Sequence, residues 1–261
     1  MNLAGIFGLA FVILFFGLMI ILAAAGRNRP GRQLREIPAF ARLRRAVGLA
    51  VEAGTRLHVS VGRGALTGLQ SAAAFMGLSM LSRIARAASI SDRPPIATSG
   101  DGSLSILSQD TLRGAYQTLG AEGQYDFSSG QLAGLTPFSY AVGTIPIIHD
   151  EQISANVLIG HFGSEVALIN DAAEQSGSLT VAGTDNLPGQ AVLYATAQEP
   201  LIGEEVFAGG AYLGAGLIHE ASLRAQDLLR MLLVIFIITA ALLRLFGLDS
   251  LILDLLAGFL P

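Results

Sequence analysis

The sequence has 261 residues, of which 52% are hydrophobic and 14% charged, with a mean hydropathy of +0.57. This composition is typical of a membrane protein with one sizeable water-exposed domain. The chain contains no cysteine and no lysine, and all 16 basic residues are arginine. Disulfides, thiolate chemistry, Schiff-base chemistry and a phosphate loop with its lysine are therefore excluded.

Residues 1–26 are predicted to form a transmembrane helix. Residues 3–25 carry no charge, and about 20 apolar residues match the ~30 Å hydrocarbon core of a bilayer. Seven arginines against one glutamate follow between residues 26 and 45, so the positive-inside rule places that side in the cytoplasm and the N-terminus outside. A cleaved signal peptide is the alternative, disfavoured because only Met1 and Asn2 precede the apolar run.

Residues 27–54 are interpreted as an Arg-rich juxtamembrane segment attracted to anionic lipid headgroups. Apolar residues at helical spacing predict a helix over residues 40–53, lying along the membrane or leading off it. From residue 46 to 226 the chain holds seven arginines against sixteen acids. Because such an acidic region repels a phosphate backbone, no nucleic-acid partner is expected.

Residues 55–216 are predicted to form a cytoplasmic α/β domain with a mostly parallel, Rossmann-like sheet covered by helices on both faces. Transmembrane helices flank this domain at both ends of the chain. Strands are expected at 57–61, 96–98, 140–148, 156–159, 179–182 and 190–196. Helices are expected at 66–88, 104–119, 164–175 with Ser164 as N-cap, and 199–213, the last one whole or broken at its glycines.

Ligands of parallel sheets bind at the carboxyl ends of the strands, which makes these ends the default site. The candidate ligand-binding residues there are Gly62, Gly64, Ser99, Asp101, His161, Glu165, Asp185 and Asn186. The turn chemistry of βα units explains the same glycines equally well. No residue is assigned as catalytic or as a metal ligand.

Two finer hypotheses concern these residues. Gly62, Gly64 and Gly68 can expose backbone amides to a phosphate, but their spacing departs from the dinucleotide fingerprint, and the cofactor stays unknown. The four ionisable candidates can form an oxygen-rich metal or acid/base cluster, or simply cap helices. His58, within a strand, is expected to be a core or interface histidine.

The C-terminal part of the chain predicts a second membrane span. Residues 217–246 form one helical pattern that starts polar and becomes wholly apolar, long enough to cross a bilayer. Residues 247–261 then predict a short amphipathic segment at the membrane boundary. Both ends of the central domain are therefore expected at the inner face of a bacterial cell membrane.

Three motifs resemble a family of uncharacterised bacterial membrane proteins known only as a domain of unknown function: residues 98–104 (TSGDGSL), 183–190 (GTDNLPGQ) and 209–215 (GGAYLGA). The resemblance implies membrane residence and transfers no activity. Small residues at 209–216 allow close backbone approach, either to another copy or another membrane protein, or within one subunit. We expect a self-assembling, non-enzymatic scaffold or ligand-responsive module; the alternative is a membrane-tethered enzyme or nucleotide-binding protein using the strand ends.

Overall fold

The computed structural model describes residues 3–27, 35–68, 70–91 and 93–246. The chain forms two compact units, one made of its two ends and the other of residues 33–215. The amphipathic segment predicted at residues 247–261 lies outside the described residues.

The helical unit pairs α1 (Leu3–Arg27) with α9 (Leu217–Leu245). The end of α1 lies beside the start of α9, where a Cβ added to Gly26 would be 3.2 Å from an Arg224 nitrogen. Their large apolar side chains are exposed along both helices, a surface that soluble monomers rarely present. Both helices are long and apolar enough to cross a membrane, which favours membrane association.

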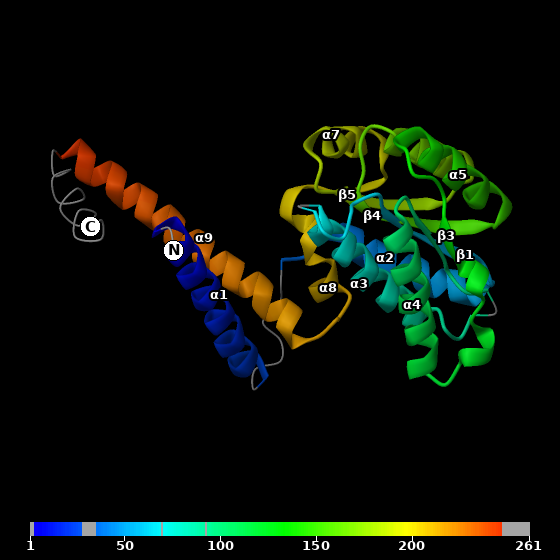
Figure 1. Ribbon diagram of the computed structural model, residues 1–261, viewed down its shortest axis with the longest axis horizontal. Coiled ribbons are helices and arrows are strands. Elements are labelled where there is room, and N and C mark those ends of the chain that lie inside the picture. Colours follow the sequence, from blue (N-terminus) through cyan, green and yellow to red (C-terminus); the bar gives the residue numbers. More distant parts are fainter. Residues whose placement is uncertain (1–2, 28–34, 69, 92, 247–261) are drawn as a thin grey trace. The chain divides into compact units, whose positions relative to one another are not determined.

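The α/β unit begins with a helix and then alternates strands with helices (Figure 1). Its elements are α2 (Pro38–Ala53), β1 (Arg56–Gly62), α3 (Ser71–Ala87), β2 (Ile96–Ser99), α4 (Gly102–Thr118), η1 (Glu122–Gln124), η2 (Phe127–Ser129), β3 (Gly130–Leu132), α5 (Pro137–Asp150), β4 (Ile153–His161), α6 (Val166–Gln175), β5 (Leu179–Thr184), α7 (Leu187–Thr196), β6 (Glu199–Leu201), η3 (Gly203–Ala208) and α8 (Gly209–Tyr212).

Within the described residues, six strands form one sheet in the order β3-β2-β1-β4-β5-β6, and all neighbours are parallel. Helices α2, α3 and α4 cover one face, and α5, α6 and α7 cover the other (Figure 1). This arrangement confirms the predicted α/β fold with a parallel sheet, helices on both faces and long apolar helices at both ends of the chain. The strand order reverses between β1 and β4, at the centre of the sheet.

Both faces of the sheet are sealed by apolar side chains. On the α5–α7 face the core gathers Tyr140, Leu158, Phe162 and Ile169 among its buried members. On the other face, α2 buries the apolar side of its amphipathic pattern against the sheet (Phe40, Leu43, Val47, Ala50). The helix predicted at residues 40–53 is therefore present, and it packs inside the α/β unit.

The two ends of the α/β unit are held together. Arg35 forms an ion pair with Glu205 in η3, and the Tyr212 hydroxyl donates a hydrogen bond to the Arg35 carbonyl. The rings of Phe40 and Tyr212 stack with their centroids 4.9 Å apart. Because α2 runs back from the carboxyl ends of the strands and η3 follows β6 directly, Arg35 and η3 both lie near that edge.

Two predicted strands are wrong. Residues 140–148 belong to helix α5, which starts with Pro137 and a capping box formed by Thr136 and Ser139. Residues 190–196 belong to helix α7, which Asn186 caps and which has Pro188 in its first turn. In both segments β-branched and apolar residues suggested a strand, but the cap and the proline at the helix start determine the local structure.

Two smaller expectations also need correction, and a third observation fits one of the alternatives left open for the small residues at 209–216. The expected helix at 199–213 is the short strand β6 followed by η3 and the four-residue α8. Ser164 is not the N-cap of α6, which begins at Val166 after Glu165. Among the small residues at 209–216, Gly209 packs inside the unit, since a Cβ there would lie 2.6 Å from the Met80 sulfur.

Candidate functional site

The eight candidate residues all lie at the carboxyl edge of four adjacent strands. Gly62, Ser99 and His161 are the last residues of β1, β2 and β4. Gly64, Asp101 and Glu165 lie in the loops that follow these strands, and Asp185 and Asn186 follow β5. In the sheet these strands are neighbours in the order β2-β1-β4-β5. The structure therefore brings the candidates to one edge, around the point where the strand order reverses, but it gives them different partners.

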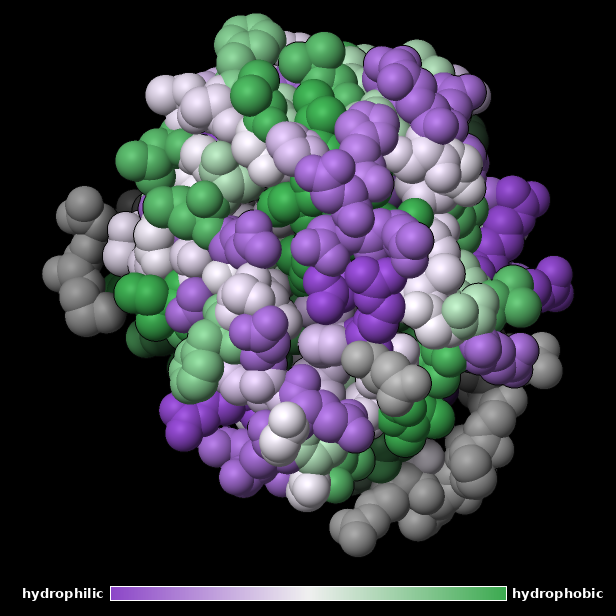
Figure 2. All heavy atoms as spheres, turned by 90° about the vertical axis from the view of Figure 1, so that its right-hand side faces the viewer, coloured by the Kyte–Doolittle hydropathy of each residue, from purple (hydrophilic) through white to green (hydrophobic). Residues whose placement is uncertain are grey.

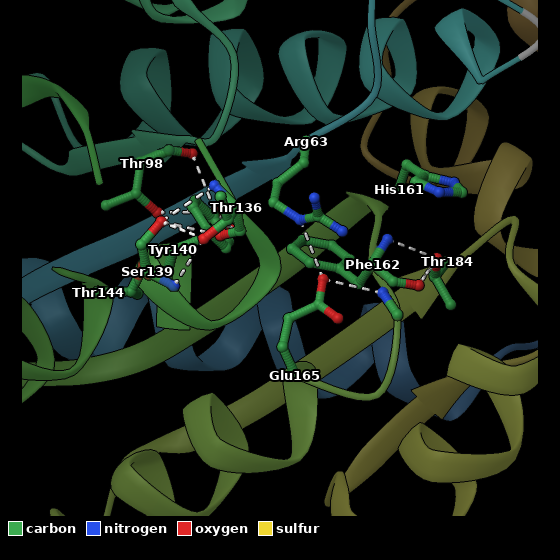
Figure 3. Close-up of polar contacts among 12 residues, drawn as sticks. Arg63, Thr98, Thr136, Ser139, Tyr140, Thr144, His161, Phe162, Glu165 and Thr184 are labelled. Carbon is green, nitrogen blue, oxygen red and sulfur yellow. Dashed lines mark hydrogen bonds and ion pairs between the residues drawn. The ribbon is translucent and has the colours of Figure 1, made fainter. Parts of the chain in front are cut away.

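The first pair at this edge joins Arg63 to Glu165 across the reversal point (Figure 3). Arg63 Nε donates to a Glu165 carboxylate oxygen at 3.1 Å, and the Gly163 amide donates to the same oxygen at 3.0 Å. The Glu165 side chain is 2% exposed and that of Arg63 is 17% exposed. A carboxylate this buried needs a counter-charge and hydrogen bonds, and both are present.

Arg63 was missed by the sequence reasoning, although it stands between two candidate glycines. Its side chain extends over Gly100, where an added Cβ would lie only 2.1 Å from the Arg63 Cγ. The pattern Gly-Arg-Gly at the end of a buried strand could have identified Arg63. A charged side chain cannot enter the core there, so it must lie among the loops at the strand ends. Gly100 therefore leaves room for the arginine.

The second pair joins His161 to Asp185. The His161 Nδ1 and a carboxylate oxygen of Asp185 are 2.7 Å apart, and both side chains are about one-fifth exposed. A carboxylate only accepts hydrogen bonds, so Nδ1 carries a proton towards Asp185, and Nε2 is left without a protein partner among the described residues. A histidine oriented in this way can bind a ligand hydroxyl or act as a general base.

Asp101 and Asn186 act as helix caps. Asp101 accepts from the amides of Ser103 at 2.9 Å and Leu104 at 3.1 Å at the start of α4. The hydrogen bond from the Ser103 hydroxyl, helped by these amides, holds the pKa of Asp101 below its usual value. Asn186 accepts from the Gly189 amide at 3.2 Å. These contacts match the capping alternative for both residues.

The glycines at the ends of β1 and β4 permit close approach of the two strands. Gly62 has φ of 75°, and a Cβ there would lie 2.7 Å from the His161 nitrogen. A Cβ on Gly160 would lie 2.1 Å from the Val61 oxygen, and one on Gly64 would lie 3.0 Å from the Gln70 oxygen. The site is thus built on a backbone contact that only glycine tolerates.

The four ionisable candidates do not converge on one point. They form one pair, His161 with Asp185, while Glu165 turns to Arg63 and Asp101 to its own helix. Throughout the described part of the chain, no three His, Asp or Glu side chains are grouped to hold a metal ion. The hypothesis of a single oxygen-rich cluster is therefore replaced by separate pairs.

A second polar network lies inside the sheet, centred on His58. The His58 ring is fully buried, with Nδ1 2.7 Å from the Asn156 oxygen and Nε2 2.8 Å from the Thr98 hydroxyl. Thr98 and Ser60 also contact the hydroxyl of Tyr140, a residue of α5. Figure 3 shows Thr98 beside Tyr140. Burial lowers the pKa of His58 from 6.5 to about 4, and the hydrogen bond to Asn156, which raises the pKa, offsets only part of this effect. His58 was expected to be a core or an interface histidine, and the structure shows that it is a core histidine.

The fold and site define a class: a parallel α/β unit with paired polar residues at its strand ends, connected to two apolar helices. The chain belongs to the family described as a domain of unknown function (DUF6754), whose model matches residues 2–253. This result confirms the family-level resemblance seen in the sequence motifs. No curated protein and no solved structure matches the chain.

Proposed function

We propose that this protein is a membrane-anchored, ligand-responsive module whose small-molecule ligand binds at the carboxyl ends of β1, β4 and β5. The observation that carries the proposal is the meeting of two polar pairs, Arg63–Glu165 and His161–Asp185, at the reversal of the strand order. The order 3-2-1-4-5-6 is that of Rossmann folds, in which ligands bind at this reversal. Two oriented polar pairs on adjacent loops at such a reversal mark a candidate ligand site.

The chemistry of the edge favours a nucleotide-like ligand, which combines an anionic group with hydroxyls. Arg63 and the start of α3, whose N-cap position makes no side-chain bond, offer donors to an anion. Nε2 of His161 and the carboxylate of Asp185 offer acceptors to hydroxyls.

The proposal includes an anchor in the cell membrane with the α/β unit in the cytoplasm. It is supported by the length and apolar composition of α1 and α9 and by the arginines between residues 26 and 45. Reporters fused after Gly120 and after Pro261 test this topology. Periplasmic reporter activity at Gly120 would contradict the proposed orientation.

Thermal unfolding of the full chain in lipid nanodiscs, with a panel of nucleotides, tests the ligand site. A ligand at 100 times its Kd adds about 2.7 kcal/mol of stability, and Arg63→Gln and His161→Gln should each remove most of that gain. Arg113→Gln, an exposed arginine on α4 distant from the strand ends, is the matched control. If no nucleotide of the panel raises the unfolding temperature, or if all variants are stabilised equally, the proposed site is contradicted.

A second candidate function, a membrane-tethered enzyme, is favoured by the orientation of His161 by Asp185. In an enzyme, Asp185→Asn would remove the carboxylate that orients His161 and cut turnover by orders of magnitude while ligand binding persists. In a responsive module, the same variant would change only the affinity. Product formation from the ligand that stabilises the protein, measured for both chains, separates the two functions.

Self-assembly is also proposed, supported by exposed apolar side chains on the α/β unit. Leu135, Phe138 and Val142 are each about two-thirds exposed near the start of α5, and such clusters mark interaction surfaces. Phe138→Glu with Val142→Glu should lower the mass of the assembly in nanodiscs. Ile106→Glu, an equally exposed site on α4, is the control. A monomer in the unmodified protein would contradict self-assembly.

A further inference from the structure

A second candidate binding site lies at the opposite edge of the sheet, where the strands begin. A groove of about 470 Å³ runs between the outer side of α2 and the residues at the starts of β4 and β5. Its volume falls within the range of about 300–1,000 Å³ that small-molecule sites occupy. Figure 2 views this edge of the α/β unit, where hydrophobic and hydrophilic surfaces alternate.

The groove is mostly apolar. Ala46, Leu49 and Ala53 line it from α2, and Leu179 lines it from the start of β5. Leu49 is 58% exposed, because the buried side of α2 is formed by other residues of the helix. An exposed leucine that lines a concave apolar wall loses contact with water when a ligand covers it.

Two arginines of α2 line the groove and differ in their partners. Arg42 is paired with the nearly buried Glu199. Arg45 is exposed and has no hydrogen-bond or ion-pair partner among the residues that the structure describes. A guanidinium without a counter-ion beside an apolar wall is complementary to a molecule with an anionic head and an apolar chain.

We propose that this groove binds a long-chain carboxylate, with its acyl chain along Leu49, Ala53 and Leu179 and its carboxylate on Arg45. The volume suits one acyl chain better than the two chains of a phospholipid. The neighbouring hollow, which shares Thr55, Ser154 and Gly177, is lined mostly by polar residues, so the apolar wall of the groove does not continue into it. The groove is separate from the site at the strand ends and does not depend on the function proposed for it.

Photolabelling tests the proposal with the full chain in zwitterionic lipid nanodiscs, because detergents would themselves occupy an apolar groove. The probe is a photoactivatable analogue of palmitate, and labelled peptides are identified by mass spectrometry. We expect label in α2 around residues 45–53 and near Leu179. The matching fatty alcohol, which lacks the charge, should label these peptides about threefold less.

Matched variants separate the groove from general partitioning into lipid. Arg45→Gln should reduce the label about threefold, and Leu49→Asp about tenfold because it places a charge on the apolar wall. Arg44→Gln, the exposed neighbour that does not line the groove, should leave the label unchanged. Equal effects of Arg44→Gln and Arg45→Gln, equal labelling by the alcohol, or label only in α1 and α9 would overturn the proposal. Absence of label because a partner protein covers α2 would overturn it equally.

Discussion

The same sheet carries two polar sites, and they differ in whether protein groups satisfy every hydrogen-bonding atom of the histidine. The network around His58 is sealed beneath α5, and its histidine has a protein partner on each ring nitrogen. The pairs at the strand ends are partly exposed, and one ring nitrogen of His161 faces no protein partner among the described residues. A sealed network contributes to stability, whereas an incomplete one can accept a ligand.

The hydrogen-bond pattern of the sealed network fixes its proton positions. Asn156 donates through its amide nitrogen to Ser178 at 2.7 Å, so its oxygen accepts from Nδ1–H of His58. Nε2 of His58 then accepts from the Thr98 hydroxyl. The neutral ring satisfies both neighbours, whereas a second proton on Nε2 would require the Thr98 hydroxyl to turn and accept instead of donate.

The largest expected effect is that of His58→Ala. It leaves Asn156 and Thr98 without their partner and opens a cavity, which should lower the free energy of unfolding by about 4 kcal/mol. Chemical denaturation followed by circular dichroism measures this change. A loss below about 1 kcal/mol would show that the network does not stabilise the sheet.

The pH dependence of stability comes next. Because burial lowers the pKa of His58 to about 4 in the folded state, the unfolded chain binds more protons between pH 6.5 and 4. Stability from this group is complete above pH 6.5 and falls by about 3 kcal/mol as the pH drops to 4. His58→Phe should remove that part of the slope; the same slope in both proteins would contradict the assignment.

The close approach of β1 and β4 should be sensitive to a single methyl group. Gly160→Ala places a Cβ against the Val61 carbonyl and should cost about 2 kcal/mol. Gly114→Ala in α4, where an added Cβ meets nothing within 4 Å, should instead stabilise by about 0.5–1 kcal/mol. Denaturation midpoints of the two variants therefore move in opposite directions. Equal shifts would contradict the close packing at the reversal point.

The smallest effect on stability is expected for His161→Ala. Its pair with Asp185 is partly exposed, and such pairs contribute at most about 1 kcal/mol. The same change should reduce ligand-induced stabilisation strongly, since His161 belongs to the proposed site. If His161→Ala destabilises the fold as much as His58→Ala, the two sites do not differ as described.

Much of this architecture could be predicted from the sequence, because the apolar residues of most strands and helices recur with the regular spacing of those elements. The ends of β1, β2 and β5, at Gly62, Ser99 and Thr184, are marked by glycine and small polar residues, and the structure places the residues that follow them on one edge. The edge strands β3 and β6 have three residues each, too short for any periodic signal. The order of the strands is set by long-range packing, which no local pattern contains.

The pairing of the site residues could not be predicted for a related reason. His161 and Glu165 are close in sequence, yet they take partners from different loops, Asp185 and Arg63. The partner of a charged side chain depends on which strands are neighbours. Once β1 lies beside β4, Arg63 reaches Glu165, and the expected four-residue cluster divides into pairs.

Hydrogen exchange mass spectrometry of the full chain in nanodiscs, with and without the nucleotide that gives the largest thermal shift, tests the central claim most directly. We expect slower exchange in the loops after β1, β4 and β5, near residues 62–68, 161–165 and 185–189. We expect no change around His58, which is fully buried. Protection confined to other segments, or none with a ligand that stabilises the protein, would contradict a site at the strand ends.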